Sequence, residues 1–148
     1  MDDFRYTQGH LMCEGLAAED LAHRFGTPLY VYSASTLTAH ADRLAAAFAE
    51  LSPTICFAVK SNGNADLLRL LHTKGLGMDV VSLGELERAF RADVPMESIV
   101  FAGVGKGDEE IAAALDGGHS PMVPYLSPEE RIRYEKRGPV ACFNAESE

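Results

Sequence analysis

The feature that most constrains the fold is a repeated alternation of short apolar runs with helical patterns. The run Ile55–Val59 is apolar and rich in strand-forming residues, residues 61–64 break it, and a leucine-rich helical pattern starts at Ala65. The same order recurs downstream, with strands expected at 78–82 and 98–102. Repeated strand–helix units predict an α/β fold with a parallel sheet, either open and doubly wound or closed into a barrel.

Capping signals set the expected helix boundaries in this region. Asn64 is placed to cap the helix that carries the leucines at 67, 68, 70 and 71. Ser82 and Glu85 have the S-x-x-E spacing of a capping box, which starts a helix with Leu86, Ala89 and Phe90 facing inward. Two further elements are expected beyond it, a helix from residue 108 to 115 and a fourth strand at 140–145.

The N-terminal part predicts a smaller set of elements. A short helix with Leu21, Ala22 and Phe25 on one face is expected to stop at Gly26. A strand at 28–32 follows, and then a long helix whose apolar face carries the large residues at 37, 44, 48 and 51. The expected organisation is therefore an N-terminal helix and strand in residues 1–34, followed by the repeated strand–helix units in residues 35–148.

Residues 119–139 interrupt the alternation of strands and helices. This connection carries four prolines and is far longer than the two to six residues, roughly, that usually join a helix to the next strand. Its charged stretch from Arg131 to Arg137 is too polar to bury much surface. A solvated surface insertion is the favoured interpretation, and a partner-binding excursion is the alternative.

Charge and composition exclude several classes of function. The net charge is −9 and Lys and Arg form no dense cluster, which argues against nucleic acid and anionic membrane as partners. No apolar stretch approaches the roughly 20 residues of a membrane span, and the acidic N-terminus lacks a signal-peptide pattern. A cytoplasmic protein is expected. Cys13, Cys56 and Cys142 are widely spaced, so neither a disulfide nor a metal site is expected.

Lys60 is the residue most able to carry chemistry. Strand alternation predicts that Cys56, Ala58 and Lys60 share one face, with the lysine at the carboxyl end of the strand. Active sites of βα barrels lie at that end. A lysine that is buried in such a place can act as an imine-forming nucleophile toward a carbonyl, which is the expectation here, or it can simply be an exposed lysine at a strand end.

The residues around Lys60 resemble a known signature. The segment Phe57–Asn62 is similar to the pyridoxal-phosphate attachment site of the ornithine/diaminopimelate/arginine decarboxylase family. Residues 26–32 and 78–86 resemble further motifs of that family in the same order. Residues 101–106 and 143–148 resemble its diaminopimelate decarboxylase branch in particular.

The resemblance implies a fold, a cofactor and site residues. The fold would be an alanine-racemase-like (β/α)8 TIM barrel, truncated here after about four strands and without the family's C-terminal β domain. Residues 35–148 would be the N-terminal half of that barrel. The cofactor would be pyridoxal 5′-phosphate, attached to Lys60, with Asp79 close to it. Spacing alone leaves a helix-capping or loop-anchoring role for Asp79 equally open. Glu85 matches an acidic family position, but its capping-box role explains it without catalysis. Lys106 is interpreted as a loop lysine.

The implied activity is decarboxylation of meso-2,6-diaminopimelate to L-lysine, in lysine biosynthesis. A small amino-acid substrate and a homodimer of the full-length protein are therefore expected. The family's phosphate-binding loop and substrate-binding arginines match no segment of the 148 residues, so we expect the isolated chain to be inactive. The alternatives are a related decarboxylase of another basic amino acid or polyamine precursor, and a non-catalytic truncated relative.

Overall fold

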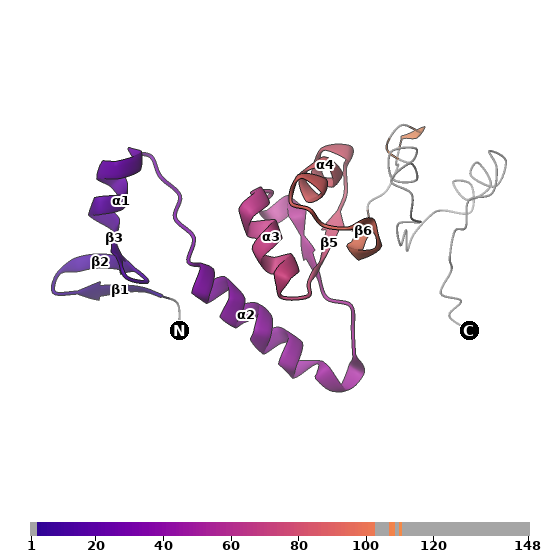
Figure 1. Ribbon diagram of the computed structural model, residues 1–148, viewed down its shortest axis with the longest axis horizontal. Helices are drawn as coiled ribbons and strands as arrows, with labels where there is room; N and C mark the ends of the chain where they lie inside the picture. Colours follow the sequence, from indigo (N-terminus) through magenta and orange to yellow (C-terminus); the bar gives the residue numbers. More distant parts are fainter. Residues whose placement is uncertain (1–2, 103–106, 109, 111–148) are drawn as a thin grey trace. The chain divides into compact units, whose positions relative to one another are not determined.

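The structure is a computed structural model that describes residues 3–102, 107, 108 and 110. Contacts divide the chain into two compact units, Met1–Ser52 and Pro53–Glu148. Figure 1 shows the elements of each unit along the chain. Each unit is described by itself.

The first unit begins with a small antiparallel sheet that the sequence patterns did not predict. Strand β1 (Phe4–Thr7) pairs with β2 (His10–Cys13), which pairs in turn with β3 (Leu16–Ala17). Gln8 and Gly9 join the first two strands with φ values of 52° and 85°. Two consecutive positive φ angles are typical of the tight turns that match the twist of a hairpin. The X-Gly pair between two short runs is therefore the sequence signal from which this hairpin could have been predicted.

Two helices complete the first unit. Helix α1 (Ala18–Phe25) ends at Gly26, as predicted. Helix α2 (Ala34–Ala47) begins where the Ser33 side chain accepts a hydrogen bond from the Thr36 amide. The predicted long helix is confirmed, but it ends earlier than expected. Its last two expected apolar residues, Phe48 and Leu51, lie outside it, and Leu51 belongs to the 3-10 turn η1 (Ala49–Leu51).

The predicted strand at 28–32 does not form. These residues are irregular, and Tyr30 is 85% exposed. Strand-forming residues make a strand only when a neighbour accepts their backbone hydrogen bonds. No described strand pairs with this segment, so the local preference for extended structure is not converted into a sheet.

The second unit contains the predicted parallel sheet. Its order is β4 (Cys56–Ala58), β5 (Gly77–Val80) and β6 (Ile99–Phe101), and both pairings are parallel. The sheet is closely spaced at Gly77, where an added Cβ would lie 2.6 Å from the carbonyl oxygen of Ser98. A side chain at this position would collide with the backbone.

The helices between these strands begin where the sequence predicts. In α3 (Ala65–Thr73), the Asn64 side chain accepts hydrogen bonds from the amides of residues 66 and 67. Helix α4 (Leu83–Arg91) begins at Ser82, and the short turn η3 (Met96–Ser98) leads into β6. Both helices contact β5, which is the arrangement expected of successive βα units.

The core of the second unit lies between its sheet and its helices. Side chains that are at most 1% exposed come from the sheet, from both helices and from the residue after α4: Leu68, Met78, Val80, Leu86, Ala89, Ala92, Ile99 and Phe101. Phe90 was predicted to face inward with Leu86 and Ala89, but it is 39% exposed. Positions 89 and 90 lie on opposite sides of position 86 around the helix, about 100° apart, so Phe90 falls at the edge of the buried face.

Several predictions fall outside the described residues. They are the strand at 140–145, the insertion at 119–139, the loop lysine at 106 and most of the helix from 108 to 115. Of that helix, Asp108 and Glu110 are described and are helical. Within the described part of the chain, no helix combines the length and apolar character that spanning a bilayer requires.

Candidate functional site

Lys60 lies at the carboxyl end of β4, but it does not belong to the strand. The strand ends at Ala58, and Lys60 is in the 3-10 turn η2 (Val59–Ser61). The prediction that Lys60 alternates with Cys56 and Ala58 on one strand face is therefore wrong. Val59 is 2% exposed, whereas Lys60 is exposed. The turn uses Val59 to anchor itself in the core, and this leaves the Lys60 amine exposed and not buried as expected.

Local hydrogen bonds close the turn around Lys60. The Ser61 hydroxyl donates to the carbonyl of Ala58 at 2.7 Å, and the Asn62 amide donates to the carbonyl of Val59 at 3.1 Å. These two bonds bracket the lysine on both sides. The Ser61 side chain and the Asn62 backbone amide thus convert the strand end into a compact turn, which the alternation pattern alone could not reveal.

Asp79 carries the most unusual polar atom of the second unit. Its neighbours along β5, Met78 and Val80, are fully buried, so by strand alternation Asp79 lies on the opposite face of the sheet. Its pairing partners are Ala58 and Val100. The Oδ1 atom is buried and has no hydrogen-bond partner among the described residues. A buried carboxylate oxygen without a donor is costly, so this atom suits a donor supplied by a ligand.

Cys56 lies on the same sheet face as Asp79. It pairs with Gly77, and its Sγ would lie 2.9 Å from a Cβ built there. Burial raises the pKa of the Cys56 thiol, and the negative charge of Asp79 raises it further. The thiol is therefore held in its neutral form, which is a poor nucleophile.

Glu85 is occupied by its capping role. Its Oε2 accepts from the amide of Val81 at 2.9 Å, while the Ser82 hydroxyl accepts from the amide of Glu85 at 3.3 Å. The predicted capping box is confirmed, with the glutamate reaching one residue further back than the usual pattern. Because Ser82 is the cap of α4, Asp79 has no helix-capping role there.

Glu110 was not singled out by the sequence patterns. Its Oε1 accepts from the Leu83 amide at 3.2 Å and its Oε2 accepts from the Gly107 amide at 2.9 Å. One side chain thus joins the start of α4 to the segment after β6. No motif predicts such a link, because it depends on the sheet bringing the two segments together. In the described residues no three His, Cys, Asp or Glu side chains gather as a metal site requires.

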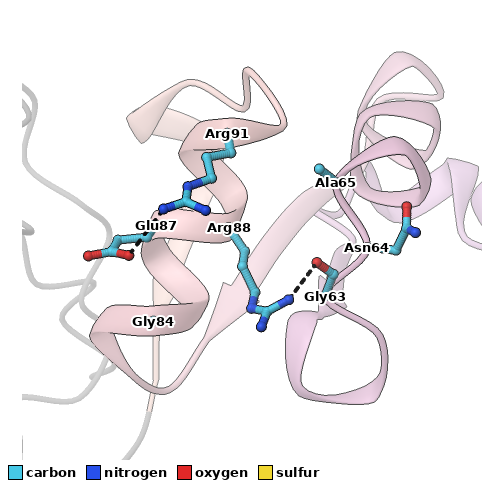
Figure 2. A pocket seen from close by; sticks show the side chains of 7 residues that line it. All are labelled: Gly63, Asn64, Ala65, Gly84, Glu87, Arg88 and Arg91. Carbon is cyan, nitrogen blue, oxygen red and sulfur yellow. Dashed lines mark hydrogen bonds and ion pairs between the residues drawn. The ribbon is translucent and has the colours of Figure 1, made fainter.

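A cavity of about 400 Å³ lies between the start of α3 and the exposed side of α4. Figure 2 shows its walls and the two interactions between the residues that line it. The lining residues are Gly63, Asn64, Ala65, Gly84, Glu87, Arg88 and Arg91. Arg91 pairs with Glu87 at 3.9 Å, and Arg88 donates to the carbonyl of Gly63 at 3.3 Å. The cavity adjoins the segment that follows Lys60.

Comparison with known proteins identifies relatives across most of the chain. The family model of the pyridoxal-dependent decarboxylases, pyridoxal binding domain, matches residues 34–146. The diaminopimelate decarboxylase of Neisseria meningitidis is 47% identical over 137 residues, which are 93% of this chain and 29% of that protein. The diaminopimelate decarboxylase of Pseudomonas fluorescens is 45% identical over 99% of this chain and 30% of its own length. The chain thus spans about 30% of these curated relatives.

Solved structures resemble the same region. A crystal structure of a protein from Aquifex aeolicus matches with a TM-score of 0.81 and 40% identity, over 90% of this chain and 33% of that one. The diaminopimelate decarboxylase of M. jannaschii, in complex with L-lysine, matches with a TM-score of 0.74 and 36% identity. That match covers 80% of this chain and 29% of the other. These neighbours agree with the mixed α/β architecture described above.

Proposed function

Because the chain belongs to the pyridoxal-dependent decarboxylases, as their pyridoxal binding domain, we propose that it is the cofactor-carrying portion of a diaminopimelate decarboxylase. The reaction would convert meso-2,6-diaminopimelate into L-lysine. The observation that carries the proposal is the accessible amine of Lys60 at the carboxyl end of β4. The neighbouring strand carries Asp79, whose buried Oδ1 has no partner within the part of the chain that the structure describes. The identity of the substrate rests on the names of the relatives.

The residues present fit pyridoxal phosphate. When bound, this cofactor supplies an aldehyde and an electron-withdrawing ring, which stabilises the charge left when a carboxylate departs. Lys60 would hold the cofactor covalently through Nζ and would be released when the amine of the substrate replaces it. Asp79 would accept a hydrogen bond at Oδ1 from the bound group, which removes the penalty of the unpartnered oxygen. Cys56, held neutral, would line the floor without competing as a nucleophile.

The proposal extends to the architecture of the whole protein. We infer that the parallel sheet β4–β6 is part of a (β/α)8 barrel, of which this chain supplies about four strands, and that residues 1–34 form a separate N-terminal segment. Support comes from the three parallel strands in consecutive order and from coverage of only 29–30% of the relatives. A homodimer and a cytoplasmic location stay predictions of the sequence.

Attachment of the cofactor to Lys60 can be tested directly on the chain. The purified chain is incubated with pyridoxal 5′-phosphate, reduced with borohydride and digested, and the modified lysines are quantified by mass spectrometry. We expect the adduct at Lys60 to exceed that at Lys74, which is an exposed lysine after α3 and serves as the matched control. Equal labelling of the two lysines would contradict the proposal.

The reaction is tested in a hybrid enzyme. This chain replaces the matching segment of the Neisseria meningitidis enzyme, so that the missing part of the protein is supplied. We expect carbon dioxide and lysine from diaminopimelate, loss of this turnover in Lys60→Ala, and no significant turnover by the isolated chain. Release from ornithine or arginine instead would favour the related decarboxylase. A folded hybrid that binds no cofactor would favour the non-catalytic relative.

A further inference from the structure

The turn that carries Lys60 has contacts beyond its own local hydrogen bonds. The bonds at Ser61 and Asn62 shape it from within, but both link residues only three apart in the chain. Such bonds fix the form of a turn without fixing its position against the rest of the molecule. Helix α4 contacts η2 from outside, and this helix approaches from a different βα unit.

Arg88 makes the side-chain part of this approach. Its Nη1 donates to the carbonyl of Gly63 at 3.3 Å, three residues after Lys60. Figure 2 shows the side chain reaching from α4 to Gly63. A Cβ built at Gly63 would lie 2.7 Å from Arg88 Cδ and 3.2 Å from Nη1. The arginine therefore packs directly on the backbone of Gly63, in space that a side chain would occupy.

We propose that Arg88 is a positioning residue for Lys60. By binding Gly63 it fixes the segment between η2 and α3 against α4, so that the Lys60 amine is presented in one place. This inference rests on the proposed function, because it assigns the position of Lys60 a chemical purpose. A group held in place before reaction avoids the ordering cost of bringing it there.

The contact is suited to positioning rather than to global stability. Arg88 is exposed, and a single long hydrogen bond at the surface contributes little to the free energy of unfolding. Arg69 provides the contrast in the same unit. Its guanidinium bonds Asp66 at 2.8 Å, Asp93 at 3.1 Å and the carbonyl of Arg91 at 3.0 Å, so it clamps α3 to the end of α4 away from the Lys60 turn.

The test compares Arg88→Ala with Arg91→Ala, in the full chain and in the hybrid enzyme. Arg91 lies one turn further along α4, lines the same cavity and pairs with Glu87 instead of reaching Gly63. We expect Arg88→Ala to weaken pyridoxal-phosphate uptake at Lys60 by about 3- to 10-fold. Arg91→Ala should stay within about 2-fold, and Arg88→Lys, which retains a donor, should recover part of the loss.

A second readout does not depend on the cofactor. Amide hydrogen exchange of peptides covering residues 59–64 should be faster in Arg88→Ala than in Arg91→Ala, while the unfolding midpoints of the two variants stay alike. A purely structural role would instead lower the unfolding midpoint and leave uptake by the folded fraction unchanged. Either that pattern or equal exchange in both variants would overturn the proposal.

The variant Gly63→Ala tests whether Arg88 affects cofactor uptake through its contact with Gly63. The new Cβ should push the Arg88 side chain aside and reproduce the loss of uptake. In the Arg88→Ala background the same substitution should add little, because the clash has been removed. If the double variant instead loses uptake by the product of the two single losses, the two positions act independently and the proposal is overturned. If Lys60 is not preferentially labelled in the parent chain, the proposed function fails; if it is labelled equally in the parent and in Arg88→Ala, this inference alone fails.

Discussion

Each of the two units of the chain is stabilised internally by a different kind of interaction. In the second unit, side chains from two helices and two strands are almost fully buried against one another. In the described part of the first unit, the buried residues are Cys13, Ser33 and Ala41, while many large apolar residues are exposed. Area removed from water is the main stabilising term of a fold. The second unit therefore has the makings of a stable core, and the first depends more on polar contacts.

A set of hydrogen bonds replaces a core in the first unit. Glu14 Oε1 accepts from the Ser33 hydroxyl at 2.9 Å and from the amide and hydroxyl of Ser35 at 3.0 Å. Asp3 accepts from the hydroxyls of Ser35 and Thr36. These carboxylates tie the ends of the small sheet to the start of α2, where negative charge is also favoured by the helix dipole.

The largest expected effect tests the core directly. Phe101 is 1% exposed and Phe25 is 62% exposed, so Phe101→Ala and Phe25→Ala delete the same side chain from opposite environments. Phe101→Ala should lower the free energy of unfolding by about 3–5 kcal/mol through lost burial and a cavity. Phe25→Ala should cost at most about 1 kcal/mol, from the loss of its contact with Arg24 at 5.1 Å.

Denaturant unfolding with hydrogen exchange measures this pair. Exchange assigns the loss to the peptides of one unit or the other. Similar losses for the two variants would contradict the contrast in burial between the units.

The extent to which the sequence predicted each unit follows the same contrast. Repeated periodicity and caps at Asn64 and Ser82 correctly predicted the strands and helices from β4 to β6, because each local pattern matches a buried face. In the first unit the expected strand at 28–32 was wrong, since pairing depends on a neighbour that local sequence does not specify. The hairpin of β1 and β2 was missed because its strands alternate weakly in hydrophobicity.

The candidate site also has features that the sequence predicted and features that it did not. Lys60 could be found from its position after an apolar run and from the resemblance of its surrounding segment. Its turn conformation could not be predicted. The Ser61 hydroxyl and the Asn62 amide form that turn by bonding backbone carbonyls, and such bonds have no sequence signature. The contacts of Arg88 and Glu110 depend on which segments the sheet brings together, and a periodic pattern carries no such information.

An intermediate effect is expected where the sheet is most closely spaced. Gly77→Ala places a Cβ 2.6 Å from a backbone carbonyl that cannot rotate away, so β5 and the start of β6 must separate. We expect a loss of about 1–3 kcal/mol in the free energy of unfolding. The matched control is Gly84→Ala in α4, where nothing lies within 4 Å of the new Cβ. That variant should be neutral or slightly stabilising, because alanine favours helix.

Thermal and denaturant unfolding of the two glycine variants provides the measurement. A tolerated Gly77→Ala would mean that the sheet adjusts more easily than its spacing suggests, and would weaken the description of the second unit as a closely packed core.

The smallest expected effect concerns the polar contacts of the first unit and their dependence on pH. Hydrogen bonds from the Ser35 amide and from the hydroxyls of Ser33 and Ser35 lower the pKa of Glu14. A carboxyl whose pKa is lower in the folded state stabilises that state above its unfolded pKa, and the contribution is lost as the pH falls through the folded value. Protection of the Ser35 and Thr36 amides from exchange, corrected for the intrinsic rate at each pH, should therefore decline in acid.

Glu14→Gln should remove most of that decline, whereas Asp3→Asn, which alters the neighbouring carboxylate, should leave the Glu14 component in place. A decline that persists unchanged in Glu14→Gln would mean that Asp3 or another group governs the acid response. Another polar group would then stabilise the start of α2 in place of Glu14.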